Sequence, residues 1–377
     1  MRDAVIVDAV RTPIGRRNGA LAESHPAHLS AHLLTALANR NDLDPVTVDD
    51  VIWGCVSQVG EQSGNVARIA ALAAQWPETV PGTTVTRACG SSQQAVSFAA
   101  ATVISGQNDV VVAGGVEVMS RVPMGSAGSI LGKPYPGEVT SRYGVDQFSQ
   151  GLGAEAMAVK WSLSRTELDE YALRSHALAA LGTDADAFGR QIVPTEMLSS
   201  DEGIRRSGTL ESLASLRPVF KEDGVIHAGN SSQISDGSGA LLITTSENAS
   251  KNGWKPVARV HTAVAVGDDP LMMLTAPIAA TAKALARANL SIEDIGAFEI
   301  NEAFAPVPVV WQKETGAAMS RTNPLGGAIA TGHPLGGSGA ILMTRLVHHM
   351  SDNGIRYGLQ SMCEAGGMAN ATILELL

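Results

Sequence analysis

Cys89 is the residue of this sequence whose setting best suits covalent chemistry. It follows a β-branched run at Val85–Thr86 and precedes an Ala-rich stretch that predicts a helix starting near Ser91. A helix N-terminus presents free N–H groups and a partial positive charge, which lower the pKa of a thiol and favour the nucleophilic thiolate. A buried thiol that packs as a hydrophobe explains the same residue equally well.

Three more polar residues lie in turns that suit proton transfer or oxyanion binding. His333, within GGAIATGHPLGGSGA, could take a thiol proton or donate to an oxyanion, although a turn could also hold it for structure alone. Cys363, within MCEAGGMANA, is expected just after a strand and could move a proton because its ordinary pKa of ~8.5 is near neutrality. In isolation, a purely structural cysteine would be the favoured explanation. Asn301 follows the strand-like run Phe298–Ile300 and could stabilise an oxyanion, or simply begin a helix.

Composition limits the other classes of function. The chain has 377 residues and a net charge of −10, which argues against nucleic acid or an acidic membrane as a partner. Its three cysteines are far apart and form no CxxC pair, so we expect neither a disulfide framework nor a metal site. Neither a signal-peptide core nor an apolar run near the ~20 residues of a membrane span is present. We therefore expect a cytoplasmic protein with reduced thiols.

The helices and strands that must position these residues are predicted to form an α/β protein whose strands are buried on both faces. The strand-like runs alternate with helical patterns and are Ala4–Val7, Val85–Thr86, Val110–Ala113, Phe298–Ile300 and Thr372–Leu374. Residues 35–53 resemble 283–299, and residues 83–115 resemble 330–367 in their order of strand, turn, helix and strand. One unit used twice explains this, as does the general likeness of α/β segments.

A different region separates the two copies. Residues 125–144 are rich in Gly and Pro, and a helix should follow that begins with the capping pattern Ser164–Glu167. A polar stretch with several arginines comes next. This region reads as an insertion that could cover a ligand.

Taken together, these motifs resemble those of the thiolase family along the whole chain and in order. The matching segments are CGSS at 89–92, AGGVEVMSRVPM at 113–124, GNSSQISDGSGA at 229–240, NEAFA at 301–305, GGAIATGHP at 326–334 and CEAGG at 363–367. The resemblance implies duplicated βαβαβαββ halves that form a five-layered α-β-α-β-α core. It also implies an N-terminal half at 1–117 plus 228–249, an inserted loop domain at 118–227 and a C-terminal half at 250–377.

The resemblance also implies roles for single residues. Cys89 would be the nucleophile, activated by His333, and Cys363 would move the proton at the α-carbon of acetyl-CoA. His333 and a water held by Asn301 would form one oxyanion hole, and the backbone N–H groups of Cys89 and Ala365 the other. Contacts with coenzyme A would come from Arg205, Ser212, Ala228 and Ser232. Coenzyme A and acetyl-CoA would be substrates, with no tightly bound cofactor, and the protein would be a homodimer or homotetramer.

The expected reaction is 3-oxoacyl-CoA + CoA = acyl-CoA + acetyl-CoA, used for the breakdown of fatty acids or steroids. Two departures from the family pattern bear on this. Ala365 stands where glycine is usual, which would endanger the second oxyanion hole if that position needs a positive φ. Ser149 and Gln150 stand where short-chain acetoacetyl-CoA thiolases carry His-Met. Acetoacetyl-CoA synthesis, decarboxylating condensation and non-catalytic acyl-CoA binding are the alternatives.

Overall fold

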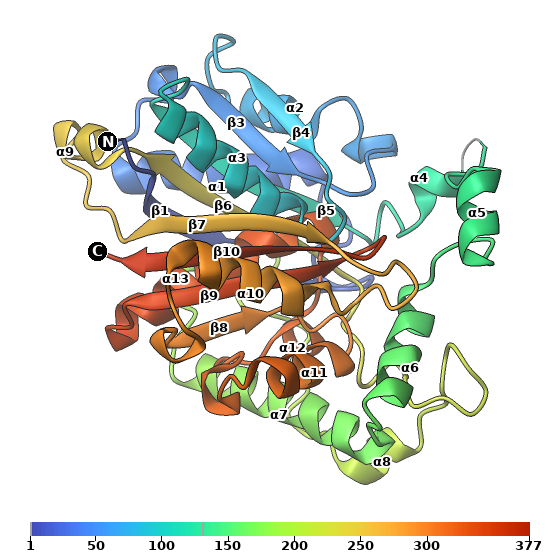
Figure 1. Cartoon of the computed structure of the whole chain (residues 1–377). Coiled ribbons are helices and arrows are strands. Elements are labelled where there is room, and N and C mark those ends of the chain that lie inside the picture. Colours follow the sequence, from blue (N-terminus) through green and yellow to red (C-terminus); the bar gives the residue numbers. More distant parts are fainter. Residues whose placement is uncertain (1, 130–131) are drawn as a thin grey trace.

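Two α/β units with the same order of elements form the core of the chain (Figure 1). The computed structural model describes residues 2–129 and 132–377. The N-terminal unit has the order βαβαβαββ, and a short strand, β2 (Gly15–Arg16), pairs with its last strand. Its elements are β1 (Val5–Arg11), α1 (Pro26–Asn41), β3 (Asp50–Gly54), α2 (Val66–Ala73), β4 (Gly82–Val85), α3 (Ser91–Ser105), β5 (Val110–Val118) and β6 (Ser235–Thr244).

The C-terminal unit follows the short helix α9 (Ser246–Lys251) and repeats this order with one change. Its elements are β7 (Ala258–Gly267), α10 (Ala276–Ala288), β8 (Ala297–Ile300), α11 (Pro306–Thr315), α12 (Ala328–Thr331), α13 (Ser338–Asn353), β9 (Tyr357–Glu364) and β10 (Met368–Leu376). Its third strand is reduced to a single bridge between Phe298 and Thr322. The side chain of Asn323 takes the place of the strand's missing backbone hydrogen bonds. It accepts a hydrogen bond from the Ile300 N–H and donates one to the Ile300 C=O, both at 2.8 Å.

Strand pairing confirms the duplication. The N-terminal strands run β4-β3-β5-β6-β1, with β3 parallel to β4 and β5 and the last two pairings antiparallel. The C-terminal strands repeat this as β8-β9-β10-β7, with one parallel and two antiparallel pairings. The start of β1 also pairs with β7, so the two sets join into one ten-stranded sheet.

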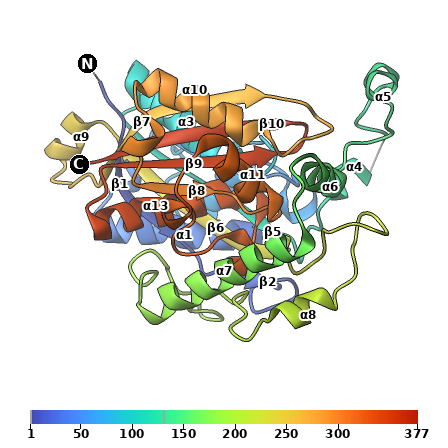
Figure 2. The ribbon, with the colours of Figure 1, turned by 60° about the horizontal axis from the view of Figure 1, so that its bottom comes forward.

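The helices form three layers around these strands. In the middle, α3 and α13 pack on each other and touch strands of both units. On the outer faces, α1 covers the N-terminal strands and α10 covers the C-terminal strands (Figures 1 and 2). Gly339 of α13 meets the backbone of Gln93 of α3 so closely that a side chain would collide with it. The expected five-layered α-β-α-β-α core is therefore confirmed.

The insertion leaves the sheet after β5 and returns at β6. It contains α4 (Ser126–Ser129), α5 (Gly137–Tyr143), α6 (Gln150–Lys160), α7 (Arg165–Asp184) and α8 (Leu210–Ala214). Helices α6 and α7 pack against α11 of the C-terminal unit, whereas α5 stands away from the body in both views (Figures 1 and 2). The predicted cap of α7 is confirmed, since the Ser164 side chain accepts a hydrogen bond from the Glu167 N–H at 3.1 Å.

The other predicted elements also occur. Each strand-like run lies within or beside β1, β4, β5, β8 or β10, and α3 begins at Ser91 as expected. All residues of β1, β5 and β6 are buried, as expected for strands covered on both faces. No helix in the described part of the chain is long and apolar enough to cross a membrane.

Candidate active site

Cys89 lies on a tight turn between β4 and α3, just before the helix begins. The preceding residue, Ala88, has a φ of 44°, a left-handed conformation that is costly for alanine and marks a constrained turn. The thiol is buried among Met119, Leu335 and Met362. Burial and, to a smaller extent, the nearby Glu364 together raise the pKa of Cys89 to about 12. The expected lowering of this pKa is therefore wrong, because desolvation outweighs the helix terminus.

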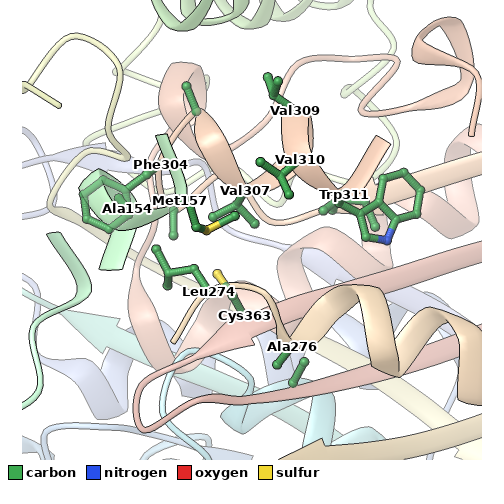
Figure 3. Packing of buried hydrophobic residues seen from close by; sticks show 14 of the residues in the cluster. Ala154, Met157, Leu274, Ala276, Phe304, Val307, Val309, Val310, Trp311 and Cys363 are labelled. Carbon is green, nitrogen blue, oxygen red and sulfur yellow. The ribbon is translucent and has the colours of Figure 1, made fainter. Parts of the chain in front are cut away.

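Cys363 lies inside β9, not after it as the sequence suggested. Figure 3 shows its thiol in an apolar cluster beside Leu274 and near Met157 of α6. Burial raises its pKa well above the usual value, and the neighbouring Cys89 adds to the rise. The two thiols are thus close enough to influence each other, and both are protonated in the resting protein.

His333 is a neutral base whose protonated nitrogen can be identified from its contacts. The Ser338 hydroxyl donates its single proton to the Pro334 carbonyl at 2.9 Å. It also lies 2.6 Å from His333 Nδ1. We assign the ring proton to Nδ1, because the amide nitrogen of Asn301, a donor, faces the other ring nitrogen. His333 Nε2 is then unprotonated and faces Asn301 Nδ2 at 3.4 Å. Burial lowers the pKa of His333 to about 4, which keeps the ring neutral at physiological pH.

Asn301 follows β8, and its neighbour Glu302 holds the surrounding loops in place. The Asn301 Oδ1 atom is buried without a hydrogen-bond partner among the described residues, so a ligand or a water could donate to it. Glu302 accepts hydrogen bonds from Tyr171 at 2.9 Å and Ser175 at 2.6 Å, both on α7, and from the Ile329 N–H at 3.1 Å. Glu302 therefore ties the insertion to the loop that carries His333.

A second buried carboxylate, Glu117, joins the two units at the site. It accepts hydrogen bonds from Val56 N–H at 2.9 Å, Ser57 N–H at 3.0 Å and Gly336 N–H at 2.8 Å. Gly336 lies three residues after His333, so Glu117 of β5 fixes the histidine loop of the other unit. Sequence reasoning missed Glu117, Glu302 and Ser338; their only signal was a position inside or next to a motif.

Ala365 presents its backbone without strain. It does not have a positive φ, and the turn after β9 uses Gly366 and Gly367 instead, at 89° and 73°. The concern that alanine could not adopt the required conformation is therefore removed. The neighbouring Glu364 is buried, and neither of its carboxyl oxygens has a hydrogen-bond partner among the described residues. Burial raises the pKa of Glu364 to about 8, and Arg87 opposes this rise.

A small cavity leads to these residues. It has a volume of about 150 Å³, and its walls include His333, Gln150, Ser232 and Phe304. Gln150 also lowers the pKa of Cys89 by hydrogen bonding, so it lies beside the thiol. The site therefore brings two buried thiols and a buried neutral imidazole near one cavity, and this combination suits acyl transfer through a cysteine.

A second cavity, of about 380 Å³, adjoins the first and shares Ser232, Gln233 and Ile234 with it. Of the four residues expected to contact coenzyme A, Arg205, Ala228 and Ser232 line this cavity. Ser212 instead closes the capping box of α8, where its hydroxyl oxygen accepts a hydrogen bond from the Thr209 N–H at 3.0 Å.

Comparison with known proteins agrees with this geometry. The family models for the thiolase N-terminal and C-terminal domains match residues 4–247 and 254–376. A steroid 3-ketoacyl-CoA thiolase of Mycobacterium tuberculosis, FadA6, is 48% identical over all of this chain and 95% of its own. A 3-ketoacyl-CoA thiolase of Escherichia coli is 42% identical, with both chains covered completely.

A solved structure supports the same relationship. The crystal structure of the Bacillus anthracis acetyl-CoA acetyltransferase superposes with a TM-score of 0.91 and 36% identity. The match covers 100% of this chain and 99% of the other. With both family models, full-length relatives and a shared fold in agreement, this chain belongs to the thiolase family and is an acyltransferase.

Proposed function

We propose that this protein cleaves 3-ketoacyl-CoA substrates with free coenzyme A, and that Cys89, His333, Cys363 and Asn301 carry out the reaction. The observation that carries the proposal is the position of His333, whose Nε2 faces Asn301 and whose ring lines a cavity together with Gln150, a neighbour of the Cys89 thiol. A resting thiol with a pKa of about 12 needs a base at the moment of attack, and His333 is that base.

The proposed steps balance in bonds and protons. Cys89 Sγ loses its proton to His333 Nε2 and bonds to the 3-keto carbon. The bond between the 2- and 3-carbons then breaks, which leaves an acyl-thioester on Cys89 and the enolate of acetyl-CoA. Cys363 gives its proton to the enolate carbon. Coenzyme A then gives its thiol proton to the Cys363 thiolate and attacks the thioester. The bond between the acyl carbon and Cys89 Sγ breaks, acyl-CoA leaves, and Cys89 takes its proton back from His333.

Two sets of donors would stabilise the negative charge that develops on oxygen. Protonated His333, with Asn301 and a water held by it, would serve the enolate. The backbone N–H groups of Cys89 and Ala365 would serve the tetrahedral intermediate on Cys89. The unstrained backbone of Ala365 supports the second assignment.

Coenzyme A would lie in the 380 Å³ cavity, with its thiol end directed toward His333. The positions of Arg205, Ala228 and Ser232 support this, and the loop domain proposed at 118–227 would cover the bound molecule. Ser212 would contribute only if its cap with Thr209 opened. We further propose a cytoplasmic homodimer or homotetramer, which light scattering of the purified protein would test.

The acyl group is proposed to be larger than acetoacetyl, such as a longer chain or a steroid-derived ring. Two observations support this: the relative named as a steroid 3-ketoacyl-CoA thiolase, and Gln150 beside Cys89 where short-chain enzymes carry His-Met. The resemblance in structure to an acetyl-CoA acetyltransferase favours acetoacetyl-CoA synthesis as the second candidate.

A thiolysis panel tests both candidates. The rate with free coenzyme A is measured on 3-ketoacyl-CoA substrates of increasing chain length and on one ring substrate. We expect kcat/KM to rise beyond the four-carbon substrate; activity on acetoacetyl-CoA alone would favour the second candidate. Cys89→Ser should lower kcat by roughly 10³-fold or more, because a hydroxyl is far harder to ionise. An acyl adduct on Cys89, detected by intact mass, would exclude a protein that only binds acyl-CoA.

A further inference from the structure

Three arginines converge at the mouth of the larger cavity. Arg16 and Arg17 come from the turn at β2, and Arg205 comes from the insertion almost 190 positions later. The other lining residues are neutral, and no acidic residue is among the described residues that line this cavity; they are Ala228, Ser232, Gln233 and Ile234. In a chain with a net charge of −10, such a grouping of positive charge is unusual.

Two carboxylates build this grouping by fastening the insertion to the N-terminal unit. Asp201 forms a two-pronged ion pair with the buried Arg11 at 2.7 and 2.9 Å, and it accepts the Ile14 N–H at 2.9 Å. Glu202 accepts the backbone N–H and the Nε–H of Arg16, at 3.1 and 3.2 Å. Figure 2 shows β2 beside the insertion. The segments that carry the three arginines are therefore held together by hydrogen bonds and ion pairs of the fold.

The segment is also fixed just beyond these carboxylates. The Arg205 N–H donates to His176 Nδ1 of α7 at 3.1 Å, which anchors the backbone and leaves the guanidinium free to face the cavity. The side chain of Gln233 donates to the Gly203 carbonyl at 3.0 Å. The carbonyl of Gln233 accepts the His333 N–H at 3.1 Å, so one residue holds both the arginine segment and the catalytic loop.

The charges are only partly compensated. Arg16 pairs with Glu202, whereas Arg17 and Arg205 form no ion pair within residues 2–129 and 132–377. The adjacent Arg206 is paired with Asp184, at 2.8 Å, and is not one of the cavity residues. Because like charges held together repel each other, the arrangement is stabilised when an anion with several charges lies between them.

We propose that Arg16, Arg17 and Arg205 form a phosphate clamp for the 3′-phosphorylated nucleotide of coenzyme A. The identity of the ligand rests on the proposed function, whereas the clamp itself rests on the geometry of the three arginines. The clamp extends the coenzyme A contact expected at Arg205 to two residues of the N-terminal unit. The cavity at which the clamp lies adjoins the pocket of His333, and the two share Ser232, Gln233 and Ile234.

The test uses the full-length protein with Arg17→Gln, a change that breaks no ion pair among the described residues. Arg287→Gln, at an exposed arginine on the outer helix α10, is the matched control. KM is measured for coenzyme A, 3′-dephospho-coenzyme A and pantetheine as acyl acceptors. Arg17→Gln should raise the KM for coenzyme A roughly 5- to 10-fold, as expected for one partly exposed contact with phosphate, and leave the KM for pantetheine unchanged.

A binding measurement separates the clamp from the catalytic proposal. Titration calorimetry with adenosine 3′,5′-bisphosphate should show binding to the parent protein, weaker binding to Arg17→Gln and parental binding to Arg287→Gln. Binding should also weaken with salt, since it is electrostatic. Equal affinity in all three proteins would overturn the clamp even if thiolysis is found. If Arg17→Gln binds the bisphosphate more weakly but the parent protein shows no thiolase activity, the clamp is supported and the proposed reaction is refuted.

Discussion

Removal of the Ser338 hydroxyl should slow the reaction without unfolding the protein. In the parent, this hydroxyl accepts the His333 Nδ1 proton at 2.6 Å and so leaves Nε2 free to act as a base. Ser338→Ala leaves a buried N–H unpaired and allows the other tautomer, in which Nε2 carries the proton. The loss of such a buried partner costs about 1–3 kcal/mol. If this whole free-energy cost disfavours the tautomer with an unprotonated Nε2, kcat/KM for thiolysis should drop by roughly 5- to 150-fold.

The chain offers a closely matched control. Ser30 in α1 is also buried, and its hydroxyl donates to the carbonyl of a proline four residues earlier, Pro26, at 2.9 Å. Ser338 makes the same bond to Pro334. Ser30→Ala should therefore match any loss of stability but keep parental kcat/KM. Thermal unfolding measures the stability of each variant, and the loss of the 3-ketoacyl-CoA absorbance measures its rate of thiolysis. Parental kcat/KM in Ser338→Ala, or an equal loss in both variants, would refute the assignment of the tautomer.

Two further predictions concern the other groups of the site. Cys363→Ala should still be acylated on Cys89 by an activated acyl thioester but should lose exchange of the acetyl-CoA α-proton with deuterated water; retained exchange would remove Cys363 from its proposed role. Glu364 titrates near 8 when folded, above its usual value of 4.5, so the folded state binds the extra proton and stability should fall as pH rises from about 4.5 to about 8. Urea unfolding at pH 5, 7 and 9 should show this decline in the parent and a flatter profile in Glu364→Gln; identical profiles would contradict it.

The sequence predicted the elements well because their signals are local. The cap at Ser164, the start of α3 and the buried strands each depend on a few adjacent residues, and the family motifs indicated the residues that meet at the site. The two repeats were also visible, since residues 35–53 and 283–299 share the same order of helix, turn and strand. In the structure, both helices end at a left-handed residue, Asp42 and Asn289.

The rest depends on contacts between distant parts of the chain. The pKa of Cys89 was predicted in the wrong direction because the apolar groups that bury it come from several segments. Glu117 and Glu302 are ordinary acidic residues in the sequence, and only the fold places backbone N–H groups around them. The arginine clamp likewise needs Asp201 and Glu202 to reach across to the N-terminal strands.

The two copies of the α/β unit place Cys89 and His333 at corresponding loops, each just before a central helix. Two identical copies would carry the same residue in both loops, and a site with one nucleophile and one base could not form. Under the proposed mechanism the two copies therefore have different tasks, because one loop carries the nucleophile and the other carries the base. The proposed site therefore needs both copies in one molecule, since either copy alone would lack one of the two groups.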